Sequence, residues 1–190
     1  MAILILGLIL FLGVHALAAT RGKRDELVAR YGERTYRLAF SAFSLVGFVL
    51  IVWGFHLYRE SGLIHVWSPP RWTRHLVFPL MWLAFVALAS TMPQPSRIRG
   101  WARHPMLVAI KIWALAHLLA NGDLGGMLLF GSFLAFAVYD RIALKRRGAA
   151  GAPREANFTR ADAVIVASGT AAYVAMIFLH PYVIGVPVIV

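Results

Sequence analysis

The sequence has no cysteine and only eight acidic residues among its 190 positions. Without thiols the chain cannot form a disulfide, hold an iron–sulfur cluster, attach a c-type haem covalently or use a thiolate nucleophile. A bound metal would need histidine, carboxylate or backbone ligands. Charged residues make up only 14% of the chain, which is atypical of soluble domains and of disordered segments.

Apolar residues are abundant instead, at 60% of the chain, which is typical of an integral membrane protein with several spans. Because backbone groups in lipid must be satisfied internally, the apolar runs are expected to be helices. We therefore predict an all-α, polytopic membrane helix bundle, a single domain over residues 1–190 with about six transmembrane helices. The predicted helices are Ala2–Thr20, Arg37–Leu57, His75–Thr91, Pro105–Ala120, Leu124–Leu144 and Asp162–Leu179.

Local signals mark several helix boundaries. Pro105 suits the first position of a helix, where its missing N–H costs nothing. The segment "TRAD", 159–162, resembles a capping box at the start of the last helix. The tight turn "NGDLGG", 121–126, predicts an antiparallel hairpin of the helices on either side. Cleavage after Ala18 as a signal peptide is not expected, since no Lys or Arg precedes Arg21.

The net charge of +11 does not indicate a nucleic-acid partner, because the cations lie in the loops between apolar runs. Fifteen of the nineteen Lys and Arg residues fall in the first, third and fifth loops, and three fall in the second. The last, Lys111, lies inside a helix. The positive-inside rule places the basic loops in the cytoplasm and both termini on the non-cytoplasmic side, with the lipid bilayer as the main partner.

Histidines are the main candidates for chemistry, because an ionisable group inside a span indicates function. Four of the seven are interpreted as structural or interfacial: His56, His65, His75 and His180. His15 and His117 lie deeper in their helices, which favours a functional role. His104 stands between Arg103 and Pro105 at a helix start, which suits either an anion site or an interfacial anchor.

Helical geometry separates His104 from His117. Thirteen residues at about 100° each place the two side chains roughly 140° apart around the helix. They are therefore not expected to be neighbouring ligands of one site. Trp113, one turn before His117, suits contact with a flat cofactor or with lipid.

Two segments, "LFLGVHALAATRG" and "RHPMLVAIKIWALAH", resemble the NnrU family of bacterial membrane proteins, which is related to zeta-carotene isomerase. The resemblance implies a non-covalent haem b in the bacterial inner membrane, with His15 and His117 as iron ligands and His104, Arg103 and Trp113 near the cofactor. It also implies a redox or nitric-oxide-handling role in denitrification, with nitrite or nitric oxide reductase components as partners. The isomerase carries a cysteine where this chain has Ala114, which disfavours isomerase activity.

Depth in the bilayer does not favour this ligand pair. His15 lies about 8 Å, and His117 about 20 Å, from the cytoplasmic end of its helix at 1.5 Å per residue. By depth, His15 pairs better with His104, and His117 pairs better with His56 or His75.

Other interpretations stay open. For a haem protein, the expected partners of the propionates are Arg103, Arg21 and Arg141, although Asp140 and Arg141 could instead form a structural ion pair. The alternatives are a haem-dependent carotenoid-type isomerase, a membrane S-adenosylmethionine methyltransferase of isoprenylcysteine type that grips the carboxylate with Arg103 and His104, and a non-enzymatic assembly factor.

Overall fold

The computed structural model describes residues 1–155 and 157–188, and these residues contain eight helices and no β-strand. The helices are α1 (Ala2–Ala19), α2 (Arg21–Tyr31), α3 (Glu33–Glu60), α4 (Thr73–Ala89), α5 (Arg97–Ala102), α6 (Pro105–Ala120), α7 (Leu124–Arg146) and α8 (Arg160–Val183).

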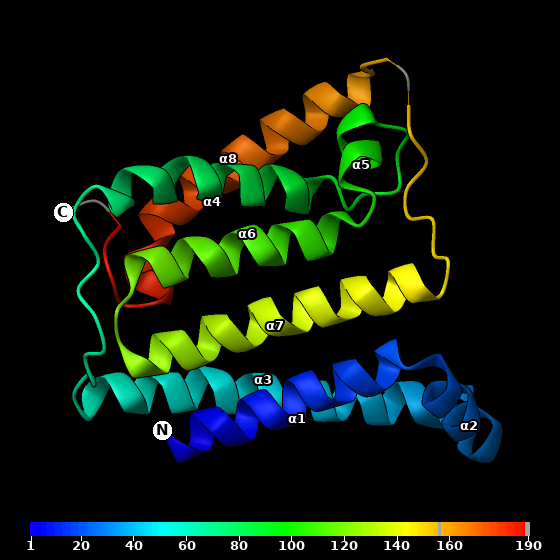
Figure 1. Ribbon diagram of the computed structural model, residues 1–190, viewed down its shortest axis with the longest axis horizontal. Coiled ribbons are helices and arrows are strands. Elements are labelled where there is room, and N and C mark those ends of the chain that lie inside the picture. Colours follow the sequence, from blue (N-terminus) through cyan, green and yellow to red (C-terminus); the bar gives the residue numbers. More distant parts are fainter. Residues whose placement is uncertain (156, 189–190) are drawn as a thin grey trace.

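The long helices pack side by side in the order α3, α1, α7, α6, α4, α8 (Figure 1). At one end of the bundle lie α2, α5 and the segment that joins α7 to α8. At the other end lie Met1, the link from α3 to α4 and the turn between α6 and α7. The three basic loops of the sequence therefore gather at the same end.

Four helices are long and apolar enough to cross a membrane, namely α1, α3, α7 and α8. Helices α4 and α6 are apolar but shorter, with 17 and 16 residues. Large apolar side chains such as Ile9, Phe43 and Phe178 are exposed on the outer faces, as expected where lipid replaces water. The chain is therefore an all-helical membrane protein, with four candidate spans and two shorter apolar helices among the described residues.

The prediction of a loop between the first two spans is wrong. Residues 21–31 form α2, because Arg, Lys, Glu, Leu and Ala favour a helix although they carry no apolar stripe. Gly32, with φ of 81°, ends α2 and lets α3 begin at Glu33, ahead of the predicted Arg37. The short helix α5 is also absent from the prediction.

Three boundary predictions are confirmed. Pro105 is the first residue of α6. Thr159 and Asp162 form the capping box of α8. Asp123 caps α7 by accepting a hydrogen bond from Gly126 N at 2.8 Å, directly after the turn that reverses the chain between α6 and α7.

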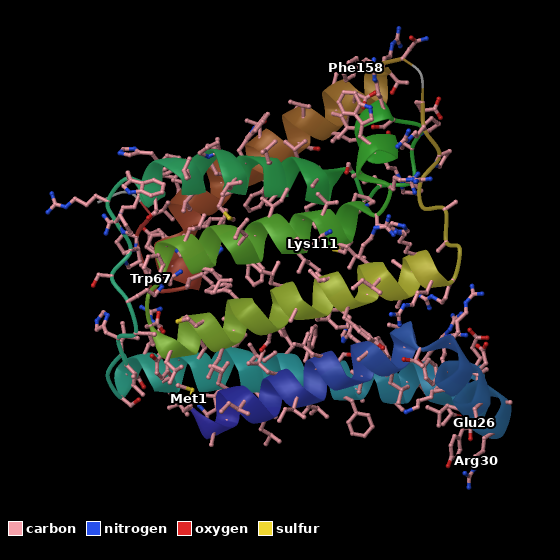
Figure 2. The ribbon with its side chains drawn as sticks, viewed as in Figure 1. Met1, Glu26, Arg30, Trp67, Lys111 and Phe158 are labelled. Atoms are coloured by element: carbon pink, nitrogen blue, oxygen red, sulfur yellow. The ribbon has the colours of Figure 1, made fainter. Side chains whose placement is uncertain are left out.

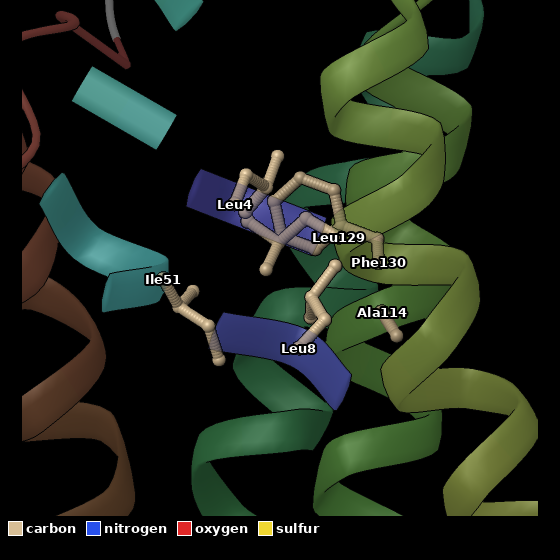
Figure 3. Packing of buried hydrophobic residues seen from close by; sticks show 6 residues of the cluster. All are labelled: Leu4, Leu8, Ile51, Ala114, Leu129 and Phe130. Atoms are coloured by element: carbon tan, nitrogen blue, oxygen red, sulfur yellow. The ribbon is translucent and has the colours of Figure 1, made fainter. Parts of the chain in front are cut away.

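Glycines allow α1 and α3 to approach closely. A Cβ on Gly7 would lie 2.6 Å from Ile51 N, and one on Gly47 would lie 2.7 Å from Phe11 N. A Cβ on Gly54 would meet the backbone of Leu4 in the same way. Beside this contact, four helices share one buried cluster (Figure 3), made of Leu4, Leu8, Ile51, Ala114, Leu129 and Phe130.

Candidate functional site

His15 lies on α1 among aromatic rings from three helices. The ring centroid is 4.3 Å from Phe11, 5.0 Å from Phe40 on α3 and 6.1 Å from Phe136 on α7. Nδ1 lies 2.7 Å from the carbonyl oxygen of Phe11. Because a carbonyl only accepts, Nδ1 of the neutral ring carries the proton and Nε2 keeps the lone pair that a metal needs.

His117 is held in the same manner near the end of α6. Its Nδ1 lies 2.8 Å from the carbonyl oxygen of Trp113, and its ring stacks on Phe130 at 4.4 Å. Trp113 also contacts Phe130 and Phe133, at 5.0 and 5.6 Å. Trp113 therefore packs into the interface between α6 and α7 and does not face lipid.

The rings of His15 and His117 pack against different aromatic neighbours and are separated by further rings. Phe11 and Phe133 are 5.8 Å apart, so the path between the histidines runs through three aromatic rings, those of Phe11, Phe133 and Trp113. His15 contacts α7 at Phe136 and His117 contacts it at Phe130, which are about 9 Å apart along the helix axis. The depth difference expected from the sequence is therefore present in the fold.

Unpartnered polar atoms lie on the α3 side of His15. The antiparallel pairing of Gly7 with Ile51, and of Phe11 with Gly47, places Ser44 opposite Val14, the residue before His15, by continuation of the register. The hydroxyl groups of Ser44 and Tyr36 are buried and have no hydrogen-bond partner among the described residues. Buried polar groups normally have a partner, so each of these two oxygens, eight residues apart on α3, lacks the partner expected for a buried hydroxyl.

Cationic groups surround the same end of α1. The guanidinium of Arg24 lies over the ring of Tyr36, 5.5 Å from its centroid. Arg147 donates to the carbonyl oxygen of Ala19 at 2.8 Å and lies 3.8 Å from the carboxylate of Asp140. The alternative of an ion pair between Asp140 and its neighbour Arg141 is not seen among the described residues, because Asp140 faces Arg147, about two helical turns further along.

The comparison with known families matches one family, described as NnrU protein, over residues 3–188, nearly the whole chain. The chain belongs to the NnrU family. No curated protein matches it, and neither does any solved structure. The resemblance seen in the two short motifs therefore extends to both ends of the described chain.

In this NnrU protein, Arg103 and His104 lie at the turn between α5 and α6. They are not among the residues that contact the rings of His15 or His117. Arg103 has φ of 56° and ψ of −45°, and His104 N donates to the carbonyl oxygen of Ala102 at 2.6 Å. This γ-turn with a left-handed centre is rare and strained for a residue with a side chain. The carbonyl oxygen of Arg103 also accepts from Ala152 N at 2.7 Å, which ties the turn to the α7–α8 segment.

Metal ligands are not clustered in this NnrU chain. Within residues 1–155 and 157–188, no three His, Asp or Glu side chains are close enough to hold an ion. Lys111, labelled in Figure 2, is half-buried on α6 and forms no ion pair in the part of the chain that the structure describes. Tyr36, Ser44 and Arg147 could not be identified from the sequence, because their position near His15 arises only from the packing of α1 against α3 and α7.

Proposed function

We propose that this NnrU-family protein binds haem b within the membrane, and that His15 would hold its iron. The observation that carries the proposal is the hydrogen bond from Nδ1 of His15 to the Phe11 carbonyl, at 2.7 Å. That bond fixes the tautomer and the ring orientation, and it leaves Nε2 free for iron, as haem-ligating histidines require.

The residues around His15 suit a haem in their chemistry. Three aromatic rings offer apolar surface for the macrocycle. The unpartnered hydroxyls of Tyr36 and Ser44 offer hydrogen bonds to polar groups at its edge. Arg24, which also lies 3.2 Å from Asp25 and 3.6 Å from Glu33, and Arg147, which lies 3.8 Å from Asp140, are the cations that propionates would share with these carboxylates. These two arginines take the place of the predicted Arg21, which is exposed, and of Arg103 and Arg141, which lie on the other side of α7.

His117 remains a predicted ligand from the family resemblance, but the packing favours one histidine for one iron. The rings of Phe11, Phe133 and Trp113 lie between His15 and His117, so both imidazoles could hold one iron only if these rings moved. His117 also has fewer cations around it, since no Lys or Arg lies in the turn that follows α6. We therefore consider His117 the less favoured of the two candidate iron ligands.

A haem with one imidazole and an open position can bind a small ligand such as nitric oxide, whereas a haem with two imidazoles is suited to electron transfer. This agrees with the nitric-oxide-handling role in denitrification implied by the family resemblance. We further propose that the end of the bundle with α2 and α5 faces the cytoplasm of a bacterium, because the Lys and Arg residues gather there. Both termini would then lie outside the inner membrane.

Absorption spectra of purified protein, expressed with ample haem, test the proposal. We expect a Soret band, a haem content near one per chain, and a spectrum that shifts on addition of nitric oxide. His15→Ala should remove the haem and His117→Ala should retain it. His56→Ala is the matched control, because His56 is exposed and lies 3.3 Å from Glu60 at the opposite end of the bundle.

Colourless wild-type protein would refute haem binding. A wild-type spectrum with two imidazoles, lost equally in both variants, would refute the single-ligand assignment and show that the three intervening rings move aside. Loss of haem in His56→Ala as well would point to general misfolding rather than to ligation.

A further inference from the structure

A second polar site lies between α5, α6 and α7, separate from His15 and its aromatic neighbours. A cavity of about 370 Å³ opens there, at the end of the bundle where the basic segments gather. Its lining residues are Thr91, Arg99, Arg103, His104, Pro105, Met106, Leu107, Asp140 and Leu144. Three of them have basic side chains, namely Arg99 on α5 and Arg103 and His104 at the turn into α6.

Two nitrogen atoms at this cavity are buried without a partner. Nε of Arg99 and Nε2 of His104 make no hydrogen bond to any described residue. Neither Arg99 nor Arg103 has a carboxylate within 4.0 Å among these residues. A buried guanidinium nitrogen without an acceptor is costly, so the arrangement lacks an anion that would complete it.

The one carboxylate at the cavity does not fill this role. Asp140 lies 3.8 Å from Arg147, which takes up part of its charge. The positive charge of Arg141 also acts on His104. The balance of fixed charge around the cavity is therefore positive.

The cationic side chains are held in place by the backbone. Asp162 on α8 accepts from Ser96 Oγ at 2.6 Å and from Ile98 N at 2.8 Å, which fixes α5 and with it Arg99. The strained γ-turn at Arg103 fixes the next two residues of the cavity wall. Strain of this kind is retained where the surrounding structure needs one particular geometry.

We infer that this cavity is a binding site for a phosphate group, held by Arg99, Arg103 and His104. Guanidinium groups match phosphate oxygens with paired, charge-assisted hydrogen bonds. An anion between them would also favour the protonated form of the His104 ring, which then donates from both nitrogens. Two guanidinium groups and an imidazole offer more N–H donors than the two oxygens of one carboxylate can accept, which favours the additional oxygens of a phosphate group as the occupant.

Two sources can supply this group, a soluble phosphate or the headgroup of an acidic phospholipid at the membrane surface. In the first experiment, delipidated protein in detergent is titrated with inorganic phosphate by calorimetry. In the second, the protein is mixed with phosphatidylglycerol or with phosphatidylcholine, and native mass spectrometry measures how much of each lipid stays bound. The test variant is Arg99→Gln. The matched control is Arg97→Gln on the same helix, because Arg97 packs over Trp101 at 4.9 Å and over Phe158 at 4.8 Å, outside the cavity.

We expect Arg99→Gln to weaken binding by about tenfold or more, and Arg97→Gln to leave it unchanged. Binding of inorganic phosphate with this pattern assigns a soluble ligand. Retention of phosphatidylglycerol over phosphatidylcholine with this pattern assigns a headgroup. Absence of both kinds of binding, or equal losses in the two variants, overturns the inference.

Two checks keep the result interpretable. His104 lies outside α5, and His104→Gln should also weaken binding, so a folding defect in Arg99→Gln alone does not decide the outcome. Haem content should be the same in wild type and in Arg99→Gln, because the cavity lies apart from His15. Failure of phosphate binding with haem retained rejects this site alone, whereas colourless protein that still binds phosphate rejects only the proposed function.

Discussion

The contact between α1 and α3 depends on Gly54, and replacing it by alanine tests how closely the two helices pack. A Cβ at this position would lie 2.7 Å from the Cα of Leu4 and 2.8 Å from the carbonyl carbon of Ile3. Ordinary carbon–carbon contacts are about 3.5–4.0 Å. Because the obstacle is backbone, no side chain can rotate away, and the helices must separate by roughly 1 Å.

Overpacking of this kind costs about 1–3 kcal/mol. Alanine recovers up to about 1 kcal/mol by its higher helix propensity. We therefore expect Gly54→Ala to lower the free energy of unfolding by about 1–2 kcal/mol. Gly13→Ala is the matched control, because Gly13 lies on α1 with nothing within 4 Å of its added Cβ, and we expect it to be neutral or slightly stabilising.

Reversible unfolding by SDS in mixed micelles, followed by tryptophan fluorescence, measures both variants. Equal stability of Gly54→Ala and wild type would refute the close approach of the helices. A loss in Gly13→Ala as large as that in Gly54→Ala would show that glycine itself, and not its place in the contact, is what matters.

Three further predictions concern the end of the bundle that carries the phosphate site. Asp162→Ala should lower the free energy of unfolding by about 3 kcal/mol or more, because it leaves buried donors unpaired, whereas the exposed Asp25→Ala should cost little in the same assay. Arg103→Gly should be more stable than Arg103→Ala by about 1 kcal/mol, because only glycine relieves the left-handed turn; equal melting temperatures would contradict this. Burial, and then the charge of Arg141, lowers the pKa of His104, so the unfolded chain binds more protons. In phosphate-free buffer the melting temperature should therefore fall from pH 7.5 to pH 5.5, and less so in His104→Gln.

Much of the architecture follows from the pattern of apolar residues, because lipid forces such runs into helices. The hairpin of α6 and α7, the proline that begins α6 and the capping box of α8 were predicted from local chemistry alone. Helix α2 was missed because a charged helix at a membrane surface has no apolar stripe to reveal it. Helix α5 was missed because six residues are too few to show a period.

The candidate sites were predicted in part. His15, Arg103 and His104 were identified because an ionisable group is conspicuous in an apolar chain. Arg99 and Asp140 could not be found in this way, since they join the cavity from separate helices and nothing in their spacing relates them.

The order of the helices has a consequence for how the protein is made. Helices α1 and α3 pack against each other and lie near the start of the chain, so they can pair as soon as they leave the translocon. Helix α4 packs against α6 and α8, which are synthesised later. Helix α7 then contacts both α1 and α6, so its insertion joins the α1–α3 pair to the α4–α6 pair and places Phe136 beside His15. A ribosome that stalls before α7 would leave two separate helix pairs in the membrane, and the surroundings of His15 would stay incomplete.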